Sequence, residues 1–267
     1  MAIGRARDAA PPATAGPSAA PPAKIAIRGV TKRYDTAEAR APVLLDVDLD
    51  IAENEFVTLI GRSGCGKTTL LNIIAGLVDA SAGTVAVDGA AVTGPGRGKG
   101  MVFQQHALFP WLSARRNIEF GARSRGLDAA AARAEADQLL ALIGLAAYGD
   151  KYPNQLSGGM QQRVAIARAL ALDPHILLMD EPFGALDEIT RIEMQEELLR
   201  VWQSRRKTVV FVTHSITEAL ILSDRVIAMR ANPGGIAAEY RIDLPRPRSR
   251  SDVRLAALHE KLWEHLR

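Results

Sequence analysis

The chain has 267 residues, of which 48% are hydrophobic and 24% are charged. This composition is typical of a globular protein with a core of its own, and it excludes a chain that is disordered throughout. The formal net charge is only +3, so charge alone does not indicate nucleic acid or an anionic membrane as a partner. The single cysteine, Cys65, excludes an intrachain disulfide framework and favours a reducing compartment such as the cytoplasm.

The N-terminal segment carries little that could fold. Residues 1–23 are rich in alanine and proline, and the paired prolines at positions 11, 12, 21 and 22 break any helix. Because such a segment lacks apolar surface to bury, we expect a disordered tail, with a targeting or docking arm as the alternative. No stretch reaches the roughly 18 to 20 apolar residues needed to cross a bilayer, so any membrane role would belong to a partner chain.

Strand patterns follow the tail. Residues 24–34 and 43–52 alternate between apolar and polar side chains, and residues 55–60 form a short apolar run that ends at a glycine. Apolar residues at helical density, closed by glycine, cover residues 70–77. Residues 83–92 predict another strand and turn. The glycine-rich stretch after the third strand therefore lies between a strand and a helix.

The middle of the chain is helical in pattern. Between residues 105 and 172 alanine, arginine and leucine recur at helical spacing, most clearly in the amphipathic segment 127–145. Continuous apolar runs at 175–180 and 208–214 are typical of strands buried on both faces of a parallel sheet, and the segment 188–206 between them predicts a helix. The pattern predicts an α/β core with a helical insert.

The end of the chain predicts a closing hairpin at 225–244, a basic loop "PRPRSRS" at 245–251 and a terminal helix at 252–267. We therefore divide the chain into the tail, one main domain at 24–235 whose helical insert covers about 105–172, and a C-terminal strand, loop and helix at 236–267. We find no internal repeat.

The first chemical motif is "GRSGCGKT" at residues 61–68, which matches GxxxxGK[ST]. Glycines let successive backbone N–H groups converge on phosphates, Lys67 neutralises the β and γ charges, and the Thr68 hydroxyl can ligate Mg²⁺. A plain glycine turn is the alternative, but the place between strand and helix favours a phosphate loop. The candidate nucleotide-binding residues of this loop are Gly61, Arg62, Ser63, Gly64, Cys65, Gly66, Lys67, Thr68 and Thr69.

An acidic pair ends the apolar strand "ILLMDEP". Asp180 can hold Mg²⁺ opposite the phosphate loop, and Glu181 can orient or deprotonate the attacking water. An acidic pair before proline can also be only a turn. The phosphate loop upstream favours the catalytic interpretation.

The stretch "LSGGMQQRVAIARAL", from Leu156, resembles the signature motif that separates the ABC ATPases from other P-loop NTPases. Ser157, Gly158 and Gly159 form a glycine-rich helix start that suits an anionic γ-phosphate. An ordinary capped helix is the alternative. The resemblance covers about residues 24–230.

Other elements of that family follow in order. Tyr34 stands where the family stacks an aromatic ring on adenine, with surface packing as the alternative. Gln104, in "MVFQQ", matches the Q-loop, whose glutamine reaches Mg²⁺ and the lytic water; a glutamine in a loop can also be simply solvated.

Two positions that come after the acidic pair in the chain also match family motifs. Asp187, in "GALD", matches the D-loop, which contacts the opposite subunit, and it can also cap the helix after it. His214 matches the switch histidine that contacts γ-phosphate. This sequence has Ser215 where many relatives carry aspartate, a departure that touches no phosphate-contacting position.

The resemblance implies a P-loop NTPase core, with a RecA-like sheet, an antiparallel β subdomain and an inserted helical subdomain. It implies ATP and Mg²⁺ as ligands, catalysis by Glu181, His214 and Gln104, and metal ligation by Thr68, Gln104 and Asp180. The chain carries one set of motifs, so it would pair head to tail with a second copy or a close relative, each ATP lying between one phosphate loop and the other signature.

Two further stretches, "ALFPW" and "ANPGGIAAEYRIDLPRP", resemble the nitrate, sulfonate and taurine importer branch. Residues 108–111 would suit a groove that grips a membrane subunit, unless Phe109 and Trp111 only pack the insert onto the core. Such an importer needs membrane permease subunits and an external solute-binding protein, and the chain would lie peripherally at the cytoplasmic face of the inner membrane. The alternative is a non-transport ABC ATPase acting on ribosomes or DNA, although we expect no nucleic acid partner.

Overall fold

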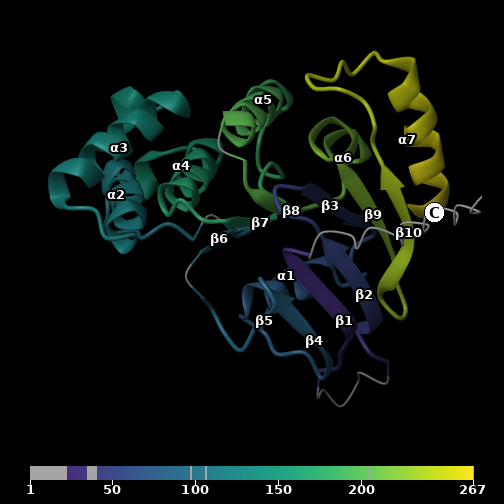
Figure 1. The fold of residues 1–267 in the computed structure, drawn as a ribbon. Helices are drawn as coiled ribbons and strands as arrows, with labels where there is room; N and C mark the ends of the chain where they lie inside the picture. Colours follow the sequence, from purple (N-terminus) through teal and green to yellow (C-terminus); the bar gives the residue numbers. More distant parts are fainter. Residues whose placement is uncertain (1–22, 35–40, 97, 106, 205, 267) are drawn as a thin grey trace, which may run out of the picture.

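The computed structural model describes residues 23–34, 41–96, 98–105, 107–204 and 206–266. The expected N-terminal tail lies outside the described residues, except for its last position. The described chain forms two sheets with helices between and around them (Figure 1).

The larger sheet has six strands in the order β10-β9-β3-β8-β7-β6. All neighbours pair in parallel except β10, which pairs antiparallel with β9 as the predicted hairpin. The central strands are buried along their whole length, which explains their continuous apolar sequences. The six strands are β3 (Phe56–Gly61), β6 (Lys99–Val102), β7 (Ile176–Asp180), β8 (Thr208–Thr213), β9 (Arg225–Arg230) and β10 (Gly235–Arg241).

The smaller sheet is antiparallel and has the order β2-β1-β4-β5. Its apolar face packs with α1 (Lys67–Ala75) and one face of the larger sheet in a single cluster, so α1 lies between the two sheets. The strands are β1 (Ile25–Lys32), β2 (Leu44–Ile51), β4 (Ala82–Val87) and β5 (Ala90–Ala91).

The opposite face of the larger sheet is covered by α5 (Glu188–Ser204), α6 (Ile216–Leu222) and α7 (Val253–Leu266) (Figure 1). Aromatic side chains fill this layer: Phe56 packs against Phe211 and, edge to face, against Trp202 of α5. The core therefore has two layers, one on each face of the sheet.

The predicted helical insert consists of α2 (Ala114–Ser124), α3 (Ala129–Leu142), α4 (Gly158–Ala171) and the short 3₁₀ helices η1 (Ala146–Tyr148) and η2 (Pro153–Gln155). It has an apolar cluster of its own and lies beyond the β6 edge of the sheet (Figure 1). The Ser113 hydroxyl and the Asp128 carboxylate cap α2 and α3 by accepting from backbone N–H groups.

The predicted basic loop turns its arginines inward. Arg248 is 9% exposed, and its guanidinium donates to the carbonyl oxygens of Leu220 and Ser223 at the end of α6, at 2.7 and 2.6 Å. Arg246 donates to the carbonyl oxygen of Leu222 at 2.6 Å. Burial lowers the pKa of Arg248 to about 10. The loop thus clamps the C-terminal end of α6, where a cation also complements the helix dipole.

Candidate nucleotide-binding site

The glycine-rich loop joins β3 to α1 and lies tightly against neighbouring backbone. Gly64 and Gly66 have φ values of 81° and 92°, in the left-handed region that favours glycine. A Cβ atom on Gly66 would lie 2.4 Å from Cδ2 of Leu44, and one on Gly61 would lie 2.7 Å from the carbonyl oxygen of Met229. A larger residue at Gly61 or Gly66 would push the loop away from Leu44 and Met229. The glycines therefore keep the loop curved, with its backbone N–H groups gathered at the start of α1.

Lys67 opens α1 and is 6% exposed. Its Nζ atom donates to the carbonyl oxygens of Gly61 at 2.8 Å and Arg62 at 3.2 Å, and it lies 3.8 Å from Sγ of Cys65. The ammonium therefore lies within the curve of its own loop, beside the positive end of the α1 dipole. A helix N-terminus with an added cation is suited to phosphate.

Thr68 and Asp180 come from distant parts of the chain and meet at this loop. The Thr68 hydroxyl donates to Oδ1 of Asp180 at 3.0 Å, and Asp180 is 5% exposed at the end of β7. Burial raises the pKa of Asp180, while the bond from Thr68 and the charge of Lys67 oppose that rise. A bound cation would favour the charged carboxylate for the same electrostatic reason.

These donors suit Mg²⁺. Thr68 offers a hydroxyl oxygen and Asp180 a carboxylate, and Gln104, which contacts the adjacent Glu181, offers an amide oxygen; Mg²⁺ prefers such oxygen ligands. Within the described ranges no three or more histidine, cysteine or acidic side chains gather as a metal cage. Mg²⁺ usually keeps several waters and is held by one or two carboxylates together with substrate phosphates, so a donor set with the single carboxylate of Asp180 fits it.

Glu181 follows β7 in a left-handed backbone conformation, with φ of 44°. Its N–H donates to the carbonyl oxygen of Val212 on β8 at 3.0 Å, which fixes this unusual geometry. Its Oε2 atom accepts from Nε2 of Gln104 at 3.2 Å and lies 3.4 Å from Nδ1 of His214. The three predicted catalytic side chains are therefore brought together where β6, β7 and β8 end.

A family model described as ABC transporter matches residues 44–184, more than half of the chain. This chain belongs to the ABC transporter family. Among the described residues of this ABC chain, no helix is both long enough and apolar enough to cross a bilayer.

Curated relatives align with about 90% of this ABC chain. An uncharacterized ABC transporter ATP-binding protein of Methanocaldococcus jannaschii is 48% identical over 244 residues, which are 91% of each chain. A taurine import ATP-binding protein of Jannaschia sp. is 45% identical over 241 residues, 90% of each chain. A solved dimeric ATP-binding cassette in a post-hydrolysis state, bound to ADP and phosphate, has a TM-score of 0.76 and 35% identity over 83% of this chain and 100% of its own.

These findings confirm the predicted P-loop NTPase fold and the predicted role as an ATP-binding, ATP-hydrolysing transporter subunit. The taurine import proteins among the relatives favour the importer over an ABC ATPase that acts on ribosomes or DNA. The solved cassettes are dimers, in agreement with the expected pairing of two ATPase subunits.

The signature and D-loop residues lie at helix starts. Ser157 is the N-cap of α4, where its hydroxyl accepts from the N–H of Met160 at 3.3 Å, and Gly158 is the first helical residue. Asp187 accepts from the N–H of Thr190 at 3.0 Å before α5, a bond that lowers the pKa of Asp187. Both segments are therefore capped helix starts, and Ser157, Gly158 and Asp187 are exposed.

Gly159 follows in the first turn of α4 and is half-buried. Tyr34 lies just after β1 and is 41% exposed. The Nζ atom of Lys32 lies over the Tyr34 ring, 4.9 Å from its centroid.

An aromatic cluster follows the Q-loop. The Phe109 ring centroid lies 5.5 Å from that of Trp111 and 4.7 Å from that of Phe120 on α2. Phe109 is half-buried under the guanidinium of Arg168, so packing within the insert explains it. Trp111 is 69% exposed and Phe120 is 49% exposed, so much of each side chain faces solvent although both rings contact Phe109.

Asn117 makes this cluster rigid. It is fully buried in α2, and its Oδ1 atom accepts from the N–H of Phe109 at 2.9 Å. Its Nδ2 atom donates to the carbonyl oxygens of Phe109, Leu112 and Ser113, at 3.0 to 3.2 Å. One buried amide thus ties the backbone of residues 109–113 to α2, with its two N–H groups shared among three carbonyl oxygens.

Two polar residues near His214 were not predicted from the sequence. Thr213 and Glu218 are buried directly beneath the turn that carries His214, and they hydrogen-bond to each other. The available signal was the pattern S-x-x-E from Ser215 to Glu218, which is typical of a helix N-terminus. That pattern predicts the cap but not the partner of the carboxylate.

Proposed function

We propose that this chain hydrolyses Mg-ATP to energise the import of a small anionic or sulfur- or nitrogen-containing solute, such as nitrate, a sulfonate or taurine. The observation that carries the proposal is the meeting of Gln104, Glu181 and His214 beside the pair of Thr68 and Asp180. The solute class rests on taurine import ATP-binding relatives at 43 to 46% identity.

The phosphates of ATP would bind the backbone N–H groups of residues 61–69 and the N-terminus of α1. Lys67 would exchange its carbonyl partners for the β- and γ-phosphate oxygens. The Thr68 hydroxyl, the Asp180 carboxylate and the Gln104 amide would hold Mg²⁺, which neutralises phosphate charge when bound. Tyr34 would stack on the adenine ring.

Glu181 would act as the general base. The attacking water oxygen forms a bond to the γ-phosphorus, the bond from that phosphorus to the bridging oxygen of ADP breaks, and the water proton passes to the Glu181 carboxylate. Gln104 would orient this water, and His214 would donate to a γ-phosphate oxygen. The observed contacts of Gln104 and His214 with Glu181 support these roles.

The active form would be a head-to-tail dimer with a second copy of the chain. Ser157, Gly158 and Gly159 of one subunit would complete the γ-phosphate site of the other, and Asp187 would lie at the interface. ATP would favour the closed dimer because both halves contact its charge, and hydrolysis would remove that contact. In this division residues 24–235 are the ATPase domain, 105–172 its insert, and 236–267 an extension that braces α6.

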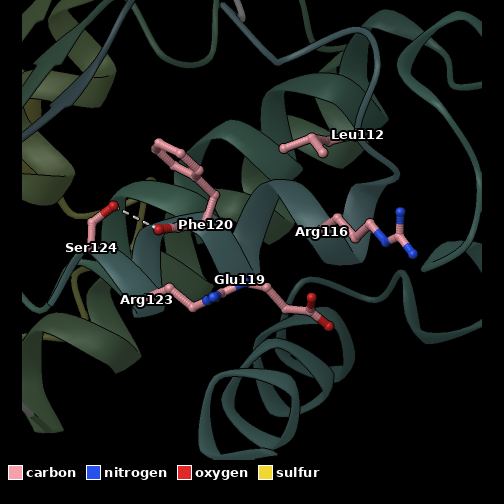
Figure 2. A pocket seen from close by; sticks show the side chains of 6 residues that line it. All are labelled: Leu112, Arg116, Glu119, Phe120, Arg123 and Ser124. Carbon is pink, nitrogen blue, oxygen red and sulfur yellow. Dashed lines mark hydrogen bonds between the residues drawn. The ribbon is translucent and has the colours of Figure 1, made fainter. Parts of the chain in front are cut away.

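A surface of the helical insert suits a membrane permease subunit. Directly after Trp111 in the chain, from Leu112 onward, an open hollow of about 700 Å³ runs along α2. Figure 2 shows its lining: two apolar side chains with basic, acidic and hydroxyl groups from successive turns of the helix. A short permease helix with an apolar anchor could enter it. The lining residues are Leu112, Arg116, Glu119, Phe120, Arg123 and Ser124.

This surface follows closely after Gln104 in the chain, and Asn117 holds it rigid. Movement of a docked permease would therefore reach the catalytic cluster through only a few residues of chain. The chain would lie peripherally at the cytoplasmic face of the inner membrane, with an external solute-binding protein delivering the solute to the permease.

The test is to tag the chain, solubilise native membranes gently and identify what co-purifies. We expect a multi-spanning membrane protein, lost when Trp111 and Phe120 are both changed to alanine and retained in the control Trp263→Ala, which removes a half-exposed tryptophan of α7. Recovery of ribosomes or DNA complexes without a membrane protein would overturn the transporter proposal. Retention of the permease by the double variant would overturn only the docking site.

A further inference from the structure

A closed ring of hydrogen bonds holds the backbone that carries His214. The Thr213 hydroxyl donates to Oε2 of Glu218 at 2.5 Å, and the same oxygen of Thr213 accepts from the N–H of Ser215 at 3.0 Å. The Ser215 hydroxyl accepts in turn from the N–H of Glu218 at 3.3 Å. Both neighbours of His214 are therefore hydrogen-bonded to Glu218: Thr213 to its carboxylate and Ser215 to its backbone N–H.

This ring is buried while His214 is not. Thr213 is 2% exposed and Glu218 is 6% exposed, but the His214 side chain is 68% exposed and its Nδ1 atom lies near Glu181. A rigid, buried base beneath an exposed functional side chain restricts where that side chain can reach. Ser215, in place of the aspartate of many relatives, performs the helix cap that this ring needs.

The second oxygen of the Glu218 carboxylate faces α5. Its Oε1 atom accepts from Nε2 of Gln195 at 3.3 Å and lies 3.9 Å from Nε of Arg191. Arg191 also donates to the carbonyl oxygens of Phe183 at 3.4 Å and Leu186 at 2.8 Å. The carboxylate thus connects the His214 turn with the loop that leads into Asp187.

We propose that Glu218 is a positioning residue for ATP hydrolysis, which fixes His214 through Thr213 and Ser215 and fixes the loop before Asp187 through Arg191. The inference rests on the proposed role of His214 at the γ-phosphate. A buried carboxylate is unfavourable unless its oxygens are hydrogen-bonded, and here Oε2 accepts from Thr213 beside His214, while Oε1 accepts from Gln195 of α5 and forms an ion pair with Arg191. A shift of the His214 turn breaks the hydrogen bond from Thr213, and a shift of the loop before Asp187 weakens the ion pair between Arg191 and Glu218.

The sharpest test removes one hydroxyl and compares it with a matched hydroxyl on the same strand. Thr213→Val breaks the ring, whereas Thr208→Val removes a buried hydroxyl at the other end of β8, which accepts from the N–H of Asn54. Both variants lose a buried hydrogen bond, so both should melt at a lower temperature. Only Thr213→Val should lower the ATPase kcat of the full chain.

We expect kcat of Thr213→Val to fall by roughly 10- to 100-fold, the size of effect that a small misplacement of a catalytic group produces. Its KM for ATP should stay within about twofold, since the phosphate loop is untouched. Thr213→Ser restores the hydroxyl and should recover most of kcat. Normal turnover in Thr213→Val, an equal loss of kcat in Thr208→Val, or a loss expressed only in KM would overturn the inference.

Two further variants separate this inference from the proposed function. Glu218→Gln keeps an oxygen that can accept from Thr213, but its NH₂ group then faces the donors of Arg191 and Gln195, which lose their acceptor. Its kcat should therefore fall while KM is unchanged. His214→Ala should lose turnover by itself. If His214→Ala is impaired while Thr213→Val and Glu218→Gln are normal, only the positioning role fails; if His214→Ala is normal, the proposed role of His214 and the inference fail together.

Discussion

The Oε2 atom of Glu181 lies 3.4 Å from the Nδ1 atom of His214. The two residues follow β7 and β8, which are parallel neighbours in the sheet, with Asp180 opposite Val212 in the register. Because parallel strands end at the same edge, residues that come just after them meet there. The left-handed conformation of Glu181 then directs its carboxylate toward His214 and Gln104.

Replacing Glu181 by glutamine should abolish turnover but not ATP binding. The amide keeps the size and the contacts of the side chain but cannot accept the proton of the attacking water, so we expect kcat to fall by roughly 10²- to 10⁴-fold. ATP affinity should be unchanged, and a closed dimer should accumulate with ATP. Steady-state ATPase assays, nucleotide titration and size-exclusion chromatography measure these three quantities.

The control for that variant is Glu196→Gln, which removes an equal charge from the exposed side of α5. It should behave as the unchanged protein in all three assays. Near-normal turnover in Glu181→Gln would refute the general-base role, and a parallel loss in the control would assign the effect to net charge.

Lys67→Ala should fail at nucleotide binding. The ammonium is the buried cation of the phosphate loop, and its removal leaves the β- and γ-phosphates facing only the backbone N–H groups and the dipole of α1. We expect ATP affinity to fall by more than about tenfold, as for loss of a charged hydrogen bond. Calorimetric titration with Mg-ATP measures it, with the exposed Lys151→Ala as the control. Unchanged affinity would count against the phosphate-loop assignment.

The sequence predicted the parts of this site that are built from local motifs. These residues lie at or just after the end of a strand whose apolar run is visible in the sequence: 61–69, Asp180, Glu181 and His214. The rule that parallel strands share an edge is enough to bring such residues together. Strand pattern and local motifs therefore predict the α/β fold class and the phosphate loop, whereas the roles of Gln104 and His214 were predicted from the resemblance to the ABC ATPases.

The buried polar contacts could not be derived in this way. Gln195 and Arg191 lie within a helix whose sequence gives no sign that their side chains reach Glu218 of another helix. Arg248 stands in a basic stretch, and arginine is mostly exposed in proteins, so its burial was equally invisible. These contacts depend on how α5, α6 and the C-terminal loop pack, which periodicity alone does not specify.

Arg248→Met should destabilise the fold without removing the active site. The variant keeps most of the buried volume but leaves the carbonyl oxygens of Leu220, Ser223 and Ile242 without their charged donor. We expect the free energy of unfolding to fall by about 2 to 4 kcal/mol, the range for buried polar groups left unpaired. Urea denaturation measures it.

The matched control is Arg254→Met, which removes an exposed arginine that pairs with Asp252 at 2.7 Å on the surface. Exposed ion pairs contribute little, so its unfolding midpoint should not change. Equal stability of Arg248→Met and the unchanged protein would mean that the C-terminal loop does not clamp α6 in solution.

Burial of Glu218 should make stability depend on pH with a defined sign. Desolvation raises the pKa of Glu218 above its ordinary value of 4.5, although the Thr213 hydroxyl and the facing charges of Arg191, His214 and Arg250 oppose the rise. Between the ordinary and the raised pKa the folded chain binds more protons at this site than the unfolded chain. The contribution of this group to the free energy of unfolding therefore falls as pH rises through that window and then levels off.

Glu218→Gln cannot titrate at this position, so it isolates the effect. Urea unfolding of both proteins between about pH 4 and pH 8 gives the difference in unfolding free energy, unchanged protein minus variant, at each pH. This difference should decrease with rising pH, whereas the same difference for the exposed Glu196→Gln should not decrease. A difference that stays flat or rises with pH would mean that Glu218 is charged and well solvated across the range, contrary to its buried position beneath His214.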